Sequence, residues 1–183
     1  FRQGDRERGT LVHIDPRFSV TAANADQWIY VTPGMEGVLA LSMAQVIISE
    51  KLGDKDAASS LSSHLDMHEY APEKVTAAIG VPANRIRETA REFASHRPSI
   101  AIGGGSASAH TNGLENLEAI YSLNYLVGSV GKPGGIVFNP PPALEGLPII
   151  PAVSPFSRIQ SLNSDMLSGK VQLLMVRGAD PVY

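Results

Sequence analysis

Short runs of β-branched and aromatic residues alternate along the chain with longer segments of helical periodicity, and no other feature of the sequence limits the fold as strongly. Such alternation is typical of an α/β fold, in which strands pair in parallel and the helices between them cover the sheet. We therefore expect a largely parallel sheet with helices on both faces, as in Rossmann-like domains. The predicted strands are Thr10–Ile14, Trp28–Val31, Ser99–Ile102 and Val171–Val176.

The longer segments predict helices. Residues Gly37–Lys51 are apolar on nearly every face, which indicates a helix covered on several sides, and Gly53 is placed to cap it. Pro72 and Pro82 each open a further helix, because proline is tolerated in a first turn. Residues Leu114–Val127 form the last predicted helix before a glycine-rich break.

The length of the chain, and the places where it starts and stops relative to the predicted strands, indicate its domain organisation. The 183 residues, 43% of them hydrophobic, can bury the core of one domain or of a piece of a larger one. The chain starts just before one predicted strand and stops just after another, so we expect residues 1–183 to be one α/β domain truncated at both ends. Within it, the polar residues 54–72 predict a surface insertion and the proline-rich residues 139–155 an irregular connection.

Charge and cysteine content exclude several classes of protein. With 15 Lys and Arg against 18 Asp and Glu, the chain lacks the basic face of a nucleic-acid binder. Without cysteine it can form no disulfide and ligate no iron–sulfur cluster by itself. The most apolar stretch, Val38–Ile48, is shorter than the about 20 residues that span a bilayer, so no direct membrane insertion is expected.

Three strand ends carry loops suited to binding a ligand, and in open α/β sheets ligands sit beyond the carboxyl ends of the strands. Asp15-Pro16-Arg17 offers an acceptor for ribose hydroxyls or a base edge and a guanidinium for phosphate. Gly103-Gly104-Gly105 runs into a helix N-terminus, which favours anions. Gly178-Ala179-Asp180-Pro181 follows the last strand. The dinucleotide fingerprint G-x-G-x-x-G fails here, because Ser108 stands at its third glycine.

The order of these motifs resembles the dimethyl-sulfoxide-reductase family of molybdopterin oxidoreductases over nearly the whole chain. The resemblance rests on Leu11–Arg17, Thr21–Ala23, Ala25–Trp28, Pro33–Glu36, Gly80–Ala83, Ala90–Ala94, Gly103–Gly105, His110–Gly113, Leu123–Gly128, Gly131–Gly135 and Gly178–Pro181. It implies one α/β dinucleotide-binding-type domain, an excerpt of a larger multidomain large subunit.

The resemblance also implies a cofactor site for molybdopterin guanine dinucleotide. Glu36, where the family usually has aspartate, would accept hydrogen bonds from guanine, and Asp15 and Arg17 would hold ribose and pyrophosphate. Asp180 stands where the family has asparagine and adds a negative charge, which weakens the case for tight binding. The remaining implied cofactor-binding residues are Pro33, Gly34, Gly104, Gly105, His110, Asn112 and Gly178.

For the full-length protein, the resemblance implies a molybdenum enzyme acting by redox chemistry on a small, sulfur-containing substrate, with an iron–sulfur cluster outside this chain. Iron–sulfur and membrane-anchor subunits of a respiratory complex are the implied partners, on the extracytoplasmic face of a membrane. No catalytic residue and no metal ligand is assigned within these residues, and the fragment alone is expected to be inactive.

Two alternatives stay open. The residues resemble both polysulfide, thiosulfate and tetrathionate reductase-like subunits and the iron–sulfur subunit of alternative complex III, a quinol-oxidising complex in which the fold is kept without molybdenum. The proline run Asn139–Pro142 supports the second, cofactor-free reading. A third resemblance, to the central domain of thiamine-diphosphate enzymes, rests on Arg97–Ile100 before the glycines and leaves Asp15–Arg17 unexplained.

Other polar and aromatic residues have simpler interpretations. His64 and His68 lie four apart near acidic residues, but no third ligand is recognisable, so no metal site is predicted. His110 fits either a cofactor contact or packing at the start of its helix. Trp28 is predicted to lie in the core, and the alternative is that it stacks on a cofactor.

Overall fold

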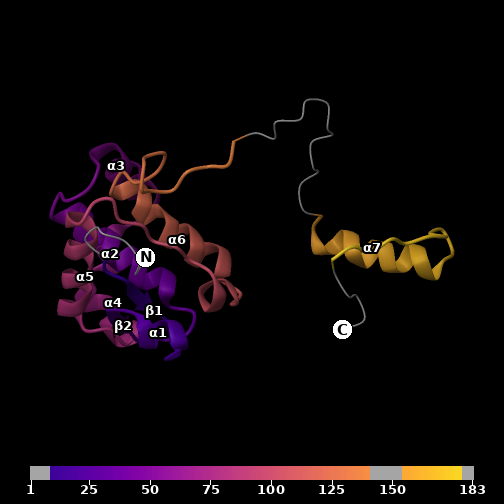
Figure 1. Cartoon of the computed structure of the whole chain (residues 1–183), viewed down its shortest axis with the longest axis horizontal. Coiled ribbons are helices and arrows are strands. Elements are labelled where there is room, and N and C mark those ends of the chain that lie inside the picture. The colour runs from indigo at the N-terminus through magenta and orange to yellow at the C-terminus, as the bar shows by residue number, and fades with distance from the viewer. Residues whose placement is uncertain (1–8, 141–153, 179–183) are drawn as a thin grey trace. The chain divides into compact units, whose positions relative to one another are not determined.

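The structure is a computed structural model that describes residues 9–140 and 154–178. The chain divides into two compact units, Phe1–Asn139 and Pro140–Tyr183, which are taken one at a time below. In the described part of the second unit the regular element is α7, Phe156–Leu167 (Figure 1). The first unit contains, in order, β1 (Val12–Ile14), α1 (Val20–Asn24), β2 (Gln27–Ile29), α2 (Glu36–Ser49), α3 (Lys55–His64), η1 (Met67–Tyr70), α4 (Pro72–Ile79), α5 (Ala83–Ser95), η2 (Gly105–Ser108) and α6 (Gly113–Leu126).

The predicted α/β class is confirmed. Strands β1 and β2 pair in parallel, with Val12 opposite Gln27 and Ile14 opposite Ile29, and the short helix α1 connects them. Because the strands are parallel, both carboxyl ends lie at one edge of this small sheet. The loops after β1 and after β2 therefore start side by side.

Helix α2 is the centre of the core, as its apolar faces predict. It packs against α4, α5 and α6, and Figure 1 shows it between α5 and α6. Ile47 of α2, Ile79 of α4, Ile86 of α5 and Leu126 of α6 are all fully buried. A helix that is packed on several sides has a fixed position. The loop after β2 leads directly into its N-terminus, so the end of that loop is held in place.

Two predicted strands are wrong within the described residues. Residues 99–102 and 171–176 belong to no strand. At Ala101 the reason is visible: its N–H donates to Asn124 Oδ1 and its carbonyl accepts from Asn124 Nδ2, both at 2.8 Å. A side-chain amide of α6 thus takes the bonds that a neighbouring strand would otherwise satisfy.

The predicted glycine cap of α2 is also wrong. Helix α2 ends at Ser49, and the residue with left-handed backbone just beyond it is Lys51, with φ 57°. Gly53 is needed for a different reason, because a Cβ there would lie 2.6 Å from the Leu126 carbonyl oxygen. Of the two helix-opening prolines, Pro72 occupies the first turn of α4 and Pro82 is the N-cap residue of α5.

Residues 54–72 hold α3, in which no residue is buried, and η1, whose Met67 is buried in the core. The proline-rich connection predicted at 139–155 lies mostly outside the described residues, since 141–153 are not among them. Helix α7, which follows it, was not predicted. None of the helices in the described ranges has the length and apolar character needed to traverse a bilayer.

Ion pairs cover the outer face of α5, as expected for a solvated charged face. Arg91 donates to both carboxylate oxygens of Glu50 at 2.8 Å, and Arg87 pairs with Glu73. The hydrogen bond from Arg91 lowers the pKa of Glu50 below its ordinary value of 4.5, and the bond from Arg87 lowers that of Glu73 in the same way. These pairs join α5 to the C-cap residue of α2 and to α4.

Candidate functional site

The loop after β2 and the loop before α6 meet at Gly34. The Gly34 carbonyl accepts hydrogen bonds from Asn112 Nδ2 at 2.9 Å and from Asn116 Nδ2 at 3.3 Å. The His110 ring lies against the glycine, since a Cβ there would be 3.5 Å from His110 Cγ. Gly34, His110 and Asn112, which lie far apart in the sequence and were predicted to share a site, are therefore neighbours.

Glu36, the first residue of α2, has a buried carboxylate with no protein partner. Only 5% of the residue is exposed, and neither carboxylate oxygen has a hydrogen-bond partner among the described residues. The N-terminal end of a helix stabilises a negative charge, but a buried carboxylate without hydrogen bonds remains costly. Two acceptor oxygens are thus held unpaired two residues beyond Gly34.

The glycines before α6 have two different roles. A Cβ at Gly103 would lie 2.7 Å from Leu117 Cδ2, and one at Gly113 would lie 2.2 Å from the Ser108 carbonyl oxygen, so both are needed for packing. Gly104 and Gly105 face open space, with nothing within 4 Å of an added Cβ. Their exposed backbone can be approached closely by a ligand.

Asp15 and Arg17 lie at the same edge of the sheet, just beyond β1. Asp15 Oδ1 accepts from the Arg17 backbone N–H at 2.7 Å, which closes a tight turn, while Oδ2 lies 3.8 Å from His13 Nε2. The Arg17 side chain is exposed. The turn therefore leaves one carboxylate oxygen and a guanidinium available beside the loop that follows β2.

Sequence reasoning missed Asn116, the residue that joins these loops. It is 3% exposed, and besides Gly34 its Nδ2 donates to the Ala107 carbonyl at 3.0 Å, while its Oδ1 accepts from the Gly37 N–H at 3.1 Å. The available signal was a polar residue on the inward, largely apolar face of α6. Asn124, on the same helix, carries the same signal and is 0% exposed.

Comparison with known proteins identifies the family of the chain. The profile of a protein family described as molybdopterin oxidoreductase matches residues 2–166. The chain belongs to this family. Among molybdopterin oxidoreductases and their relatives, it is 30% identical to a menaquinone reductase molybdopterin-binding-like subunit of Nitratidesulfovibrio vulgaris, over 98% of this chain and 26% of the relative.

Two further proteins are similar to this chain. A thiosulfate reductase molybdopterin-containing subunit of Salmonella typhimurium is 30% identical over 72% of this chain and 18% of its own length. The solved structure of acetylene hydratase from Pelobacter acetylenicus matches with a TM-score of 0.58 and 30% identity, over 66% of this chain and 17% of that one. The chain spans about a quarter or less of these proteins, whose names include reductases and a hydratase.

Pro33, Gly178 and Asp180 are the other residues that the family resemblance implicates. Pro33 is exposed next to Gly34. Gly178 belongs to the second unit, where its φ is 72°, and Asp180 lies outside the described residues. The roles of Gly178 and Asp180 toward a cofactor stay predictions.

The prediction that Trp28 is a core residue is wrong. It is 36% exposed, donates from Nε1 to the Asp15 carbonyl at 3.0 Å, and makes edge contacts with the rings of Phe18 and Tyr30. Side chains alternate between the two faces of a strand, and the face that carries Ile29 is the buried one. Trp28 therefore supports the Asp15 turn from the outer face of the sheet.

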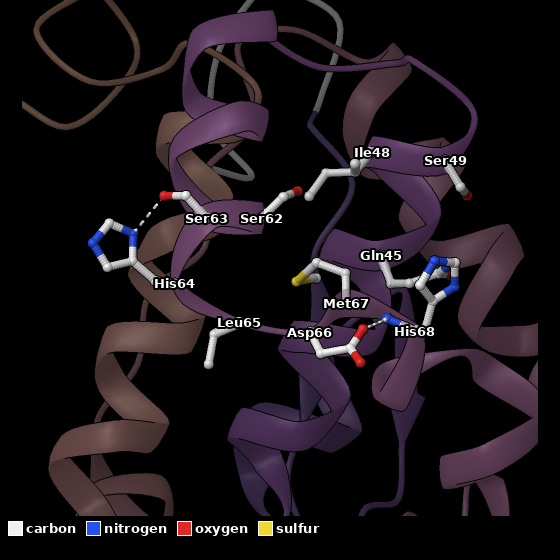
Figure 2. A pocket seen from close by; sticks show the side chains of 10 residues that line it. All are labelled: Gln45, Ile48, Ser49, Ser62, Ser63, His64, Leu65, Asp66, Met67 and His68. Atoms are coloured by element: carbon white, nitrogen blue, oxygen red, sulfur yellow. Dashed lines mark hydrogen bonds between the residues drawn. The ribbon is translucent and has the colours of Figure 1, made fainter.

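The histidine pair lines a separate pocket of about 630 Å³ between α2, α3 and η1 (Figure 2). His64 Nδ1 lies 2.8 Å from the Ser60 carbonyl oxygen, and the backbone N–H of His68 donates to Asp66 at 3.0 Å. Figure 2 shows the two rings on opposite sides of the pocket. In the described part of the chain, no group of three or more His, Cys, Asp or Glu side chains is placed to hold a metal ion.

Proposed function

We propose that this chain is the part of a molybdopterin oxidoreductase large subunit that holds the guanosine and pyrophosphate of molybdopterin guanine dinucleotide. The observation that carries the proposal is Glu36, whose two buried oxygens have no partner in the described protein. A buried carboxylate of this kind fits a ligand that brings two hydrogen-bond donors. Guanine offers them at N1–H and the exocyclic amine, whereas adenine does not.

The other residues of the site fit the rest of the nucleotide. The open backbone at Gly104 and Gly105 suits a group that must come close to the main chain, such as a phosphate or the pterin. Asp15 Oδ2 and the exposed Arg17 suit a ribose hydroxyl and a pyrophosphate. The bound cofactor would supply the redox chemistry, and these residues would bind and orient it.

For the whole protein we propose redox chemistry on a small, sulfur-containing substrate. The likeness to a thiosulfate reductase subunit supports this substrate class. The proposed partners are iron–sulfur and membrane-anchor subunits at the extracytoplasmic face of a membrane, with the iron–sulfur cluster bound outside this chain. The menaquinone reductase and thiosulfate reductase relatives are both described as subunits, which supports an assembly of several chains.

A second candidate is a cofactor-free subunit of a quinol-oxidising respiratory complex that keeps the fold. One observation favours the cofactor-free part of this candidate: the relative that matches 98% of this chain is described as molybdopterin-binding-like. That relative belongs to a menaquinone reductase, whose name gives quinone reduction and not quinol oxidation. The two candidates differ in whether Glu36 meets a guanine. Nucleotide binding therefore separates them.

Calorimetric titration of the chain with GDP and with ADP tests the proposal, because GDP carries both the guanine and the pyrophosphate. We expect binding of GDP in preference to ADP, and Glu36→Gln should weaken GDP binding by about 1–3 kcal/mol, since it replaces a charged acceptor of two bonds. The matched control is Glu115→Gln, a glutamate in the first turn of α6 that is exposed. Equal binding of the two nucleotides, or no effect of Glu36→Gln, would contradict the proposal.

A further inference from the structure

We infer that Asn116 is the positioning residue of the nucleotide site, which sets the distance between the Glu36 carboxylate and the glycine-rich turn at residues 103–105. This inference rests on the function proposed above. It concerns a residue that we expect to touch no nucleotide, because its amide is already occupied by protein groups.

The side-chain amide of Asn116 is fully used by three backbone groups, which belong to two segments of the chain. Its Nδ2 donates to the Gly34 carbonyl at 3.3 Å and to the Ala107 carbonyl at 3.0 Å, and its Oδ1 accepts from the Gly37 N–H at 3.1 Å. An amide has two N–H donors and one carbonyl acceptor, so no other side chain of this size provides the set. The buried position excludes the water that could otherwise replace these bonds.

Glu36 lies between the backbone groups that Asn116 holds. Gly34 precedes it by two residues and Gly37 follows it directly, so the amide ties the chain on both sides of the carboxylate. The approach is close enough to require glycine: a Cβ on Gly37 would lie 2.4 Å from Asn116 Oδ1. The position of Glu36 thus depends on Asn116.

The third bond reaches the other half of the site. Ala107 belongs to η2, which begins at Gly105, the glycine whose backbone faces open space. A single amide therefore links the proposed guanine acceptor to the turn proposed for the phosphates or the pterin. Asn112 adds to the link, since its Nδ2 donates to Gly34 and lies 3.4 Å from Asn116 Oδ1.

Asn124 provides a matched comparison within the same helix. It is equally buried and bonded to backbone, but two of its bonds, of 2.8 Å, go to Ala101 and a third, of 3.2 Å, goes to the Tyr121 carbonyl, and none involves Gly34 or η2. Replacing either asparagine by aspartate keeps the acceptor oxygen and removes the N–H donors. Both changes should destabilise the chain to a similar extent, whereas only the change at Asn116 should disturb the nucleotide site.

The test is GDP titration of the Asn116→Asp and Asn124→Asp chains, with thermal unfolding measured in parallel. At pH 8 we expect Asn116→Asp to weaken GDP binding by about tenfold or more, the effect of one or two lost hydrogen bonds. Asn124→Asp should stay within about twofold of the wild type. On acidification the carboxyl introduced by Asn116→Asp gains a proton and can donate to one carbonyl again, so the affinity of this variant alone should recover relative to wild type.

Hydrogen exchange of the nucleotide-free chains gives a second readout. In Asn116→Asp we expect faster exchange at residues 34–37 and at 104–112 together, and in Asn124→Asp at neither. If the wild-type chain fails to bind GDP, the proposed function is wrong. The exchange data still show whether Asn116 couples residues 34–37 to residues 104–112. The inference would be overturned if Asn116→Asp and Asn124→Asp had the same affinity for GDP, or the same exchange rates at these residues. If Asn116→Asp does not fold, Asn116→Ser, which retains one donor, replaces it under the same criteria.

Discussion

Two buried polar residues of the site differ in their hydrogen bonding, although they lie close in the structure. Asn116 has every donor and acceptor paired, whereas both carboxylate oxygens of Glu36 lack a partner among the described residues. A paired amide stabilises the fold, while an unpaired buried charge destabilises it. We interpret the first as the support of the site and the second as its binding group.

This contrast predicts that Glu36→Met stabilises the nucleotide-free chain. A buried, unpartnered carboxylate that is replaced by an apolar group of similar length should raise the free energy of unfolding by about 1–3 kcal/mol. Denaturant unfolding measures the effect, and GDP binding should be lost in the same variant. A lower stability of Glu36→Met would show that the carboxylate already has a partner in the free protein.

The ion pair of Glu50 and Arg91 predicts a pH dependence at the level of single residues. Arg91 lowers the pKa of folded Glu50 below its ordinary value of 4.5, so the pair adds stability above that value and loses it as pH falls through the lowered pKa. Wild type should therefore unfold at a slightly higher temperature than Glu50→Gln at neutral pH.

The difference should disappear in acid and shrink in high salt, because both side chains are partly exposed. Thermal unfolding of the two chains across this pH range is the measurement. Glu115→Gln serves as the control, and a difference that persists well below the ordinary pKa of glutamate would contradict the ion-pair explanation.

At the scale of elements, helices could be predicted from the sequence and strands only in part. The apolar pattern of 37–51 and the proline at 72 locate α2 and α4, because helical periodicity and capping are local properties. The run Ser99–Ile102 has the composition of a strand, but a strand needs a neighbouring strand to pair with. Here the Asn124 side chain forms hydrogen bonds with the backbone N–H and carbonyl of Ala101 instead. Its partner lies 23 residues further along the chain, beyond what a local pattern can indicate.

The close crossing of α2 and α6 at Gly37 predicts that Gly37→Ala lowers the stability of the chain. The added Cβ would lie 2.4 Å from Asn116 Oδ1 and 2.7 Å from its Cα, so the helices must separate, which should cost about 1–3 kcal/mol of unfolding free energy. Gly104→Ala is the control, because its backbone is extended, with φ 163°, and a Cβ there meets open space. Equal stability of the two variants in denaturant would contradict the tight crossing.

At the scale of the molecule, the order of short motifs indicated both the family and part of the site. Gly34, His110 and Asn112 were assigned to one site from their resemblance to family motifs, and the structure brings them together. The motifs could not indicate Asn116, since its role depends on three backbone groups supplied by other elements. The chain belongs to the molybdopterin oxidoreductases; that it holds the nucleotide end of a cofactor is our proposal.

We propose that Glu36 and the loops around it bind a guanine nucleotide cofactor. Nucleotide and metal analysis of the purified full-length protein tests it most directly, with the Glu36→Gln variant measured alongside. We expect guanine nucleotide together with molybdenum or tungsten in the wild-type protein, and a clear loss of both in the variant. A folded wild-type protein that contains neither a guanine nucleotide nor either metal would contradict the account.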